Sequence, residues 1–431
     1  MNLSPRIPAL LLTALVVTAC APQTSSNSSS DKDEKTGTLR VWLFQEVGNE
    51  PKQKVVDSVV AAFEKAHSGI NVDVEYIPVE TRAQRVKAAF NDPSSAPDVM
   101  EYGNTDTAGY VKDGGLLDVS KEFAGWSEAK DTDPTAKTSV TVDGRIYGSP
   151  FYVGVRALYY RTDVFKELGL EAPRTMTELA VTARKIRAAK PELYGLVVGG
   201  AYTYGAMPFI WANGGELATG KDGSYASAIS GGSAQKGIKE YTSLFTDDNC
   251  PAAKCAGMGG NDTITAFAAG KAAMAIGGDF SHTAVEAGKV KGEYAVVPLP
   301  GVSAGSIAPA FAGGNNIGVL KSTSHRTMAV QLMEQLTSKK TQTAMFDAMG
   351  FLPTFPDVRQ QVAAEQPYVK PFARTLAAGT KFVPASPAWS QIDSSSVLPT
   401  MFQEVISGKK SVAAASKEAA TKMNDAFGSA G

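Results

Sequence analysis

Three acidic residues of the sequence stand where carboxylate chemistry is possible: Glu46, Asp106 and Asp279. An ionised carboxylate only accepts hydrogen bonds, so it suits a ligand rich in hydroxyl donors. Two carboxylates at a set separation can also hydrolyse a glycosidic bond. The amides of Asn49 and Asn104 both donate and accept, and each lies close in sequence to one of these acids. The residue types favour recognition of a polyhydroxyl compound, with its hydrolysis or simple solvated loop acids as the alternatives.

Several aromatic side chains fall between residues 151 and 211. A pyranose has apolar C–H faces and a rim of hydroxyls, so its site needs flat aromatic faces beside polar groups. We expect such faces, with polar neighbours, from this stretch. The candidates are Phe151, Tyr152, Arg156, Tyr202, Tyr204, Trp211 and Asn213.

Structural roles stay open for several of these residues. Trp211 could pack beneath the Gly-Gly turn that follows it, and Arg156 could pair with a structural acid. Asn213 and the further candidate Asn315 stand beside glycines, where asparagine tolerates left-handed turns. Trp42 lies inside an apolar strand and is interpreted as core.

The segment from residue 38 to 106 alternates strand and helix. A parallel sheet covered by helices on both faces is expected from this order. Ligands of such sheets bind beyond the carboxyl ends of the strands, where residues 45–49 and 104–106 fall. The expected strands are 38–44, 70–76 and 98–102, and the expected helices are 54–66 and 81–90.

A second alternation begins near residue 157 and predicts a second α/β lobe. A Gly- and Ala-rich bridge, residues 301–314, precedes the last strand. The fold class is therefore α/β with two lobes, each a mostly parallel sheet flanked by helices. The expected strands are 157–160, 195–199, 272–276 and 316–320, and the helices are 175–189, 235–245, 326–337, 340–348, 397–406 and 412–427.

Composition excludes several classes of function. Forty-two basic and 43 acidic residues give a net charge of −1, so no footprint for nucleic acid is present. Three histidines, far apart in sequence, offer no metal spacing, and we expect neither metal nor cofactor. No serine-hydrolase elbow, zinc-protease helix or phosphate loop occurs. Cys250 and Cys255 enclose a short loop and should form a disulfide in an oxidising compartment, with two free thiols as the alternative.

The N-terminus has the layout of a secretory signal. One basic residue precedes a short apolar run, which ends in small residues before Cys20. This arrangement resembles the lipobox of bacterial lipoproteins, which implies removal of residues 1–19 and diacylation of Cys20. Residues 20–37 lack large apolar side chains and should form a flexible tether. We therefore expect a lipid-anchored protein on the outer face of the cell membrane.

Nine sequence pieces, in order along the chain, resemble the sugar-type extracellular solute-binding proteins of ABC importers, the family of maltose-binding-like proteins. The resemblance spans almost all of residues 38–427, and the style of the lipobox is similar to that of actinobacteria. The pieces are Leu39–Trp42, Phe63–Val74, Ala96–Val99, Gly114–Asp118, Tyr147–Pro150, Leu158–Tyr160, Trp211–Gly215, Phe267–Met274 and Gly313–Ile317.

The resemblance implies a two-lobed, type II periplasmic-binding-protein-like fold with a hinge. Lobe one would contain residues 38–145 with 313–356, and lobe two residues 146–312 with 357–431. Asp279–Phe280 matches a family loop that commonly carries a stacking tryptophan, replaced here by Phe280. Trp389 stands where a late family aromatic enters the cleft. A monomer that delivers its ligand to membrane permease subunits is implied.

Aromatic faces spread over the chain favour a di- or short oligosaccharide over a monosaccharide. Chito-, cello-, xylo- and malto-oligosaccharides all fit, and we favour an N,N′-diacetylchitobiose-like ligand. A charged small solute is the main alternative, since it would need convergent charges. The second alternative is a glycoside hydrolase at the cell surface.

Overall fold

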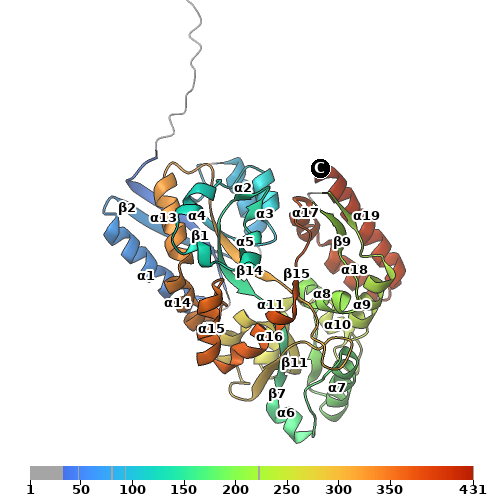
Figure 1. Ribbon diagram of the computed structural model, residues 1–431. Coiled ribbons are helices and arrows are strands. Elements are labelled where there is room, and N and C mark those ends of the chain that lie inside the picture. Colours follow the sequence, from blue (N-terminus) through green and yellow to red (C-terminus); the bar gives the residue numbers. More distant parts are fainter. Residues whose placement is uncertain (1–32, 47, 79–80, 93, 222–223, 431) are drawn as a thin grey trace, which may run out of the picture. The chain divides into compact units, whose positions relative to one another are not determined.

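The computed structural model describes residues 33–430 apart from 47, 79–80, 93 and 222–223, and residues 33–431 form one compact unit (Figure 1). The expected signal, Cys20 and most of the expected tether lie outside the described residues. Within the described part, no helix is long and apolar enough to cross a membrane.

The first sheet has the order β2-β1-β3-β14-β6. β1 pairs in parallel with β2 and β3, whereas β14 is antiparallel to both β3 and β6. The strands are β1 (Gly37–Phe44), β2 (Ile70–Ile77), β3 (Val99–Gly103), β6 (Ser149–Gly154) and β14 (Gly313–Val319). β6 thus belongs to the first sheet, although its residues lie beyond the expected lobe boundary at 145/146.

Both faces of β1 are buried, which explains its apolar sequence. Leu39, Val41 and Leu43 pack on one face with residues of α1, α13 and α14, while Trp42 packs on the other with α2. Trp42 is 9% exposed, so its interpretation as core is confirmed. The helices of this lobe are α1 (Glu50–Ala66), α2 (Arg82–Asn91), α3 (Thr107–Lys112), α4 (Ser120–Gly125), α5 (Pro134–Thr138), α13 (Arg326–Thr337) and α14 (Lys339–Met349), with η1 (Ala129–Asp131) and the hairpin β4 (Thr141–Val142) and β5 (Arg145–Ile146).

The second sheet has the order β12-β7-β11-β8 around a separate hydrophobic core. Only β11 and β8 pair in parallel; β7 is antiparallel to β11 and β12. Both sheets are therefore mixed rather than mostly parallel, because strands that follow a crossing between lobes enter their sheet in the opposite direction. The strands are β7 (Arg156–Arg161), β8 (Tyr194–Val197), β11 (Ala272–Gly278) and β12 (Tyr294–Val297).

Helices α9, α18 and α19 lie side by side at the end of the second lobe (Figure 1). The helices here are α6 (Thr162–Glu167), α7 (Met176–Ala189), α8 (Thr203–Ala212), α9 (Gly232–Thr242), α10 (Ala252–Cys255), α11 (Gly260–Ala268), α12 (His282–Glu286), α17 (Ala388–Ser394), α18 (Val397–Ile406) and α19 (Val412–Ala430). The other elements are α15 (Pro356–Glu365), α16 (Lys370–Ala378), η2 (Asp279–Ser281), η3 (Pro367–Val369), β9 (Ala218–Lys221), β10 (Ser224–Ser227), β13 (Ala310–Phe311) and β15 (Thr380–Lys381).

Three segments connect the lobes, and Asp279 joins two of them. Its carboxylate accepts the backbone N–H groups of Val155 at 2.7 Å and Leu352 at 3.3 Å. On the third segment, Gly314 has φ +134°, and a Cβ there would lie 2.1 Å from the carbonyl oxygen of Tyr152. Only glycine fits this close approach.

Residues 33–37, the end of the expected tether, are hydrogen-bonded to the first lobe. The Asp33 carboxylate accepts from the Thr327 backbone N–H at 2.9 Å, and the Glu34 N–H donates to the Ser324 carbonyl at 2.8 Å. Gly37 then begins β1.

Cys250 and Cys255 form a disulfide in the structure, with Cα atoms 6.1 Å apart. The bridged segment and the residues directly after it hold the turn that leads into α8: the Gly200 N–H donates to the Cys255 carbonyl at 3.1 Å, and the Ala201 N–H to the Met258 carbonyl at 3.0 Å. The disulfide therefore supports the segment that carries Tyr202 and Tyr204.

Candidate functional site

The acid that follows β1 lies beside a buried ion pair. Glu46 is a quarter exposed and its Oε1 lies 3.9 Å from Nζ of Lys52. Burial raises the pKa of Glu46, although the positive charge of Lys52 opposes this. The Asn49 Oδ1 accepts the Glu46 N–H at 3.0 Å, while its Nδ2 is buried without a hydrogen-bond partner among the described residues.

Lys52 and Glu101 fix the loop that carries Glu46. Their side chains are fully buried and 2.8 Å apart. Glu101 also accepts the Phe44 N–H at 2.8 Å and the Asn315 Nδ2 at 2.6 Å, and Lys52 donates to the Phe44 carbonyl at 2.8 Å. The ends of β1, β3 and β14 are therefore tied to α1 at one point.

Asp106, which follows β3, meets residues of α17. The Ser390 hydroxyl donates to Oδ1 of Asp106 at 3.2 Å. Burial, with the negative charge of Asp393, raises the pKa of Asp106 to about 7. Gly109 permits this approach, because a Cβ there would lie 2.8 Å from Oγ of Ser390. The carboxylates of Asp106, after β3, and Asp393, in α17, are therefore close enough for the charge of Asp393 to affect the ionisation of Asp106.

Tyr204 links this acid pair to a set of aromatic rings. Its hydroxyl donates to Oδ2 of Asp393 at 3.2 Å, and its ring stacks on Phe311 with centroids 4.6 Å apart. Arg156 lies over the same rings: its guanidinium carbon is 5.4 Å from the centroid of Tyr204 and 5.5 Å from that of Phe280. We call Asp106, Asp393, Arg156, Tyr204, Phe280 and Phe311 the interlobe cluster; among the described residues, Glu46 makes no hydrogen bond, ion pair or ring contact with it.

The model of one protein family, described as bacterial extracellular solute-binding protein, matches residues 48–343. The chain belongs to this family. Among its relatives, the diacetylchitobiose-binding protein DasA of Streptomyces coelicolor is 26% identical over 90% of this chain and 91% of its own. A maltodextrin-binding protein of Bacillus subtilis is 26% identical over 79% and 78%.

Solved structures of solute-binding proteins share the fold. That of an ABC-transporter solute-binding protein from Thermotoga lettingae, bound with α-D-tagatose, superposes with a TM-score of 0.81 at 26% identity, covering 91% of this chain and 100% of the other. The maltose-bound MalE3 of T. maritima gives a TM-score of 0.78 at 20% identity, over 90% and 99%. The expected family and two-lobed fold class are confirmed.

In this solute-binding protein, three aromatic residues expected at the ligand are core residues. Phe151 is 1% exposed, Trp211 3% and Trp389 0%. Phe151 packs in the first-lobe core, whereas Trp211 and Trp389 pack in the second. Their faces are covered by other apolar side chains in this conformation, so they do not offer a stacking surface here.

Of the remaining expected residues, Tyr202 contacts Arg156, whereas Tyr152 and Asp279 make structural contacts. Tyr202 accepts the Arg156 Nε–H at 2.8 Å, and Tyr152 stacks on Phe351 with centroids 4.2 Å apart. Asp279 is fully buried and serves the crossings described above. Burial raises its pKa to about 7.

The two asparagines beside glycines do not occupy left-handed turns. Asn213 has φ −87° and donates from Nδ2 to the Glu240 carboxylate at 2.6 Å, while Gly214 takes φ +73°. Asn315 lies within β14 and donates to Glu101. The turn interpretation is wrong for both, because the adjacent glycines supply the positive φ.

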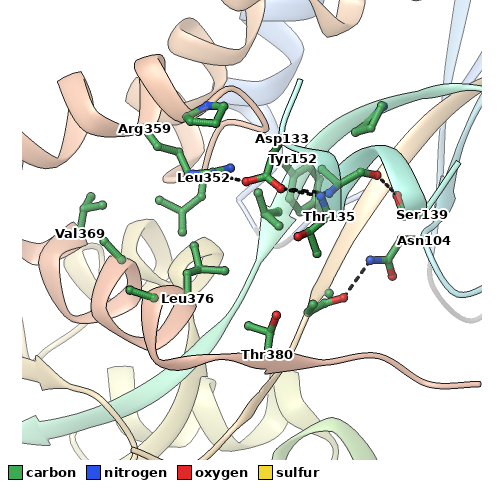
Figure 2. A pocket seen from close by; sticks show the side chains of 18 of the residues that line it. Asn104, Asp133, Thr135, Ser139, Tyr152, Leu352, Arg359, Val369, Leu376 and Thr380 are labelled. Atoms are coloured by element: carbon green, nitrogen blue, oxygen red, sulfur yellow. Dashed lines mark hydrogen bonds and ion pairs between the residues drawn. The ribbon is translucent and has the colours of Figure 1, made fainter. Parts of the chain in front are cut away.

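A cavity of about 520 Å³ adjoins the crossings (Figure 2). Of the expected residues only Asn104 and Tyr152 line it; Asn104 donates from Nδ2 to the Ala312 carbonyl at 2.9 Å, and Asp133 pairs with Arg359 at the far wall. Its other walls, from α15 and α16, are largely aliphatic. This lining offers few flat faces for a saccharide.

Sequence reasoning missed Ser390, Asp393 and Phe311. Ser390 and Asp393 stand one and four residues after Trp389. The sequence pattern therefore indicated the correct segment, but the tryptophan was taken as its ligand-binding residue. In α17, Ala388, Trp389 and Ile392 are buried, whereas Ser390 and Asp393, three residues apart, share the neighbouring face of the helix.

Proposed function

We propose that this protein is the substrate-binding lipoprotein of an ABC importer and that it captures a di- or short oligosaccharide between its lobes. Closure around the ligand would be a hinge motion of the crossings, driven by contacts to both lobes. The loaded protein would then deliver the sugar to the permease. We favour an acetamido sugar of the chitobiose type among the chito-, cello-, xylo- and malto-series.

The contact between Asp106 and Ser390 is the observation that supports this most directly. It brings a polar group of the loop after β3 against α17, beside the Tyr204–Asp393 bond. Carboxylates that accept from hydroxyls and rings that cover apolar faces are what a saccharide requires. Opening at this contact would expose both kinds of group.

The relatives support the same class of ligand. Their names cite diacetylchitobiose, galactooligosaccharide and maltodextrin. A phosphate ligand is less compatible with a cluster that contains two carboxylates and four aromatic rings, counting Tyr202, whereas an amino acid stays the alternative that titration with amino acids tests.

Titration calorimetry and thermal unfolding test the proposal on the chain without residues 1–20. The four disaccharide series and an amino-acid panel are compared, and a ligand at a hundredfold excess over Kd should add about 2.7 kcal/mol to the free energy of unfolding. Asp393→Ala should weaken binding at least tenfold, whereas Asp425→Ala, an exposed acid of α19, should not. Binding of amino acids and of no sugar contradicts the saccharide proposal.

Hydrolysis is the second candidate, because a carboxyl with a pKa of about 7 beside another acid is suited to proton transfer. Chromatography of the titrated sugars separates the two functions. Intact sugar after prolonged incubation supports binding; cleavage that Asp106→Asn abolishes overturns it.

The lipid anchor is tested on the full chain in a Gram-positive host. We expect labelled palmitate to enter the wild-type protein and not Cys20→Ser, which should appear in the medium instead. Retention of the unlabelled variant at the membrane would contradict the anchor.

A further inference from the structure

Arg156 stands out in the interlobe cluster because its guanidinium makes no direct contact with an acid among the described residues, although its charge acts on buried Asp279 and opposes the rise in the pKa of that carboxyl. A guanidinium carries five N–H donors, and only Nε–H has a hydrogen-bond partner among the described residues, the Tyr202 hydroxyl at 2.8 Å. No described carboxylate lies within ion-pair distance of it. The in-plane donors on the other two nitrogens therefore remain unmatched.

Aromatic rings surround this cation without satisfying those donors. Its guanidinium carbon lies 5.4–5.9 Å from the centroids of Tyr202, Tyr204, Phe280 and Phe311. Rings stabilise a cation through their faces, but they accept no hydrogen bond in the guanidinium plane. Arg156 is partly exposed, so water can reach these donors, and a ligand that supplies in-plane acceptors can take the place of that water.

The neighbouring carboxylates are engaged elsewhere. Asp279 accepts from two backbone N–H groups, Asp393 from Tyr204, and Asp106 from Ser390. Arg156 is also fixed in position, because it is the first residue of β7 and follows the crossing at Val155. The donors of Arg156 and the carboxylate of Asp393 thus lie at the same ring, that of Tyr204, and the second oxygen of Asp393 can still accept a hydroxyl or amide N–H group.

We infer that Arg156 selects saccharides bearing a planar C=O substituent, an acetamido carbonyl or a ring carboxylate, over unsubstituted sugars. The in-plane lone pairs of such a group match the fork of a guanidinium, whereas a hydroxyl offers a single weaker acceptor. An acetamido group would also present its N–H to a neighbouring carboxylate. This inference rests on the proposed saccharide-binding function and names the subclass of ligand.

Calorimetry with three classes of disaccharide tests it: diacetylchitobiose, digalacturonate, and the unsubstituted cellobiose, xylobiose and maltose. Wild-type protein should bind one substituted class at least tenfold more tightly than every unsubstituted sugar, and the favoured class identifies the substituent. Arg156→Lys and Arg156→Gln should lose about 10- to 100-fold in affinity for that class and change affinity for unsubstituted sugars less than threefold.

Arg161→Lys is the matched control, since Arg161 lies at the other end of β7 and pairs with Asp163. It should leave all affinities unchanged. Thermal unfolding of each variant confirms that the comparison is between folded proteins, and the two Arg156 variants must agree.

Equal wild-type affinities for substituted and unsubstituted sugars overturn the inference about Arg156 and leave the proposed function standing. A preference for substituted sugars that survives both Arg156 substitutions has the same consequence. Failure of every sugar to bind overturns the proposed function and the inference with it.

Discussion

Nζ of Lys52 lies 2.8 Å from Oε2 of Glu101, and neither side chain is exposed. Removing one member leaves the other charge buried without its partner, which typically costs 3–5 kcal/mol. Glu101→Gln should therefore lower the free energy of unfolding by about this amount in urea denaturation. Lys54→Met breaks an exposed pair with Glu50 and should cost less than about 1 kcal/mol. Similar midpoints for both variants would refute the structural role of the pair.

The pKa of about 7 for Asp106 makes stability depend on pH. Because this folded-state pKa exceeds the ordinary value of 3.8, the unfolded chain binds fewer protons between these limits. The stabilising contribution is complete below about pH 4 and lost as pH rises through 7, by at most about 1.4 kcal/mol per unit for one proton. Asp106→Asn should flatten the melting temperature between pH 4 and 7 relative to Asp425→Asn. Parallel curves would show that Asp106 ionises normally.

Trp389 is completely buried, so its truncation should act on stability. Trp389→Ala leaves a large cavity and should cost about 3–5 kcal/mol, whereas Trp389→Phe should cost less. Phe382→Ala removes a 40% exposed ring and should change stability by under about 1 kcal/mol. Unfolding in urea measures all three. A Trp389→Ala protein with wild-type stability but no sugar binding would make this residue a ligand contact.

The disulfide between Cys250 and Cys255 should stabilise the protein modestly, because it closes a short loop. Chain-entropy arguments give about 2 kcal/mol for a loop of this length. The double variant Cys250→Ser/Cys255→Ser should unfold earlier by this amount, and a reductant should shift only the wild type. Intact mass after alkylation without reductant gives the bonding directly; two alkylated cysteines would mean free thiols.

Much of the fold could be predicted because local patterns determine it. The helices α13 and α18 begin and end where their apolar spacing indicated, and β1 was evident from its run of apolar residues. The direction of the strands could not be predicted, since it depends on how the chain crosses between lobes. β14 runs antiparallel to β3, a relationship that no local pattern of either strand contains.

The candidate site was predictable only in its first-lobe half. Residues after β1 and β3 follow from the rule on carboxyl strand ends, whereas the partner of Asp106 lies 284 residues further along. The aromatic residues were harder, because stacking faces and core side chains have the same composition. Trp389 and Tyr204 illustrate this: burial separates them, and burial is a property of the folded chain.

Gly314 has a consequence for how this protein can diversify. A substitution there would need a φ of +134° and would push a Cβ against the Tyr152 carbonyl, so the crossing tolerates no side chain. The loops after β1 and β3 carry no such restriction at Glu46 or Asp106. If the lobes close as proposed, changes in ligand specificity are expected at loop residues such as Glu46 and Asp106, while position 314 is expected to stay glycine.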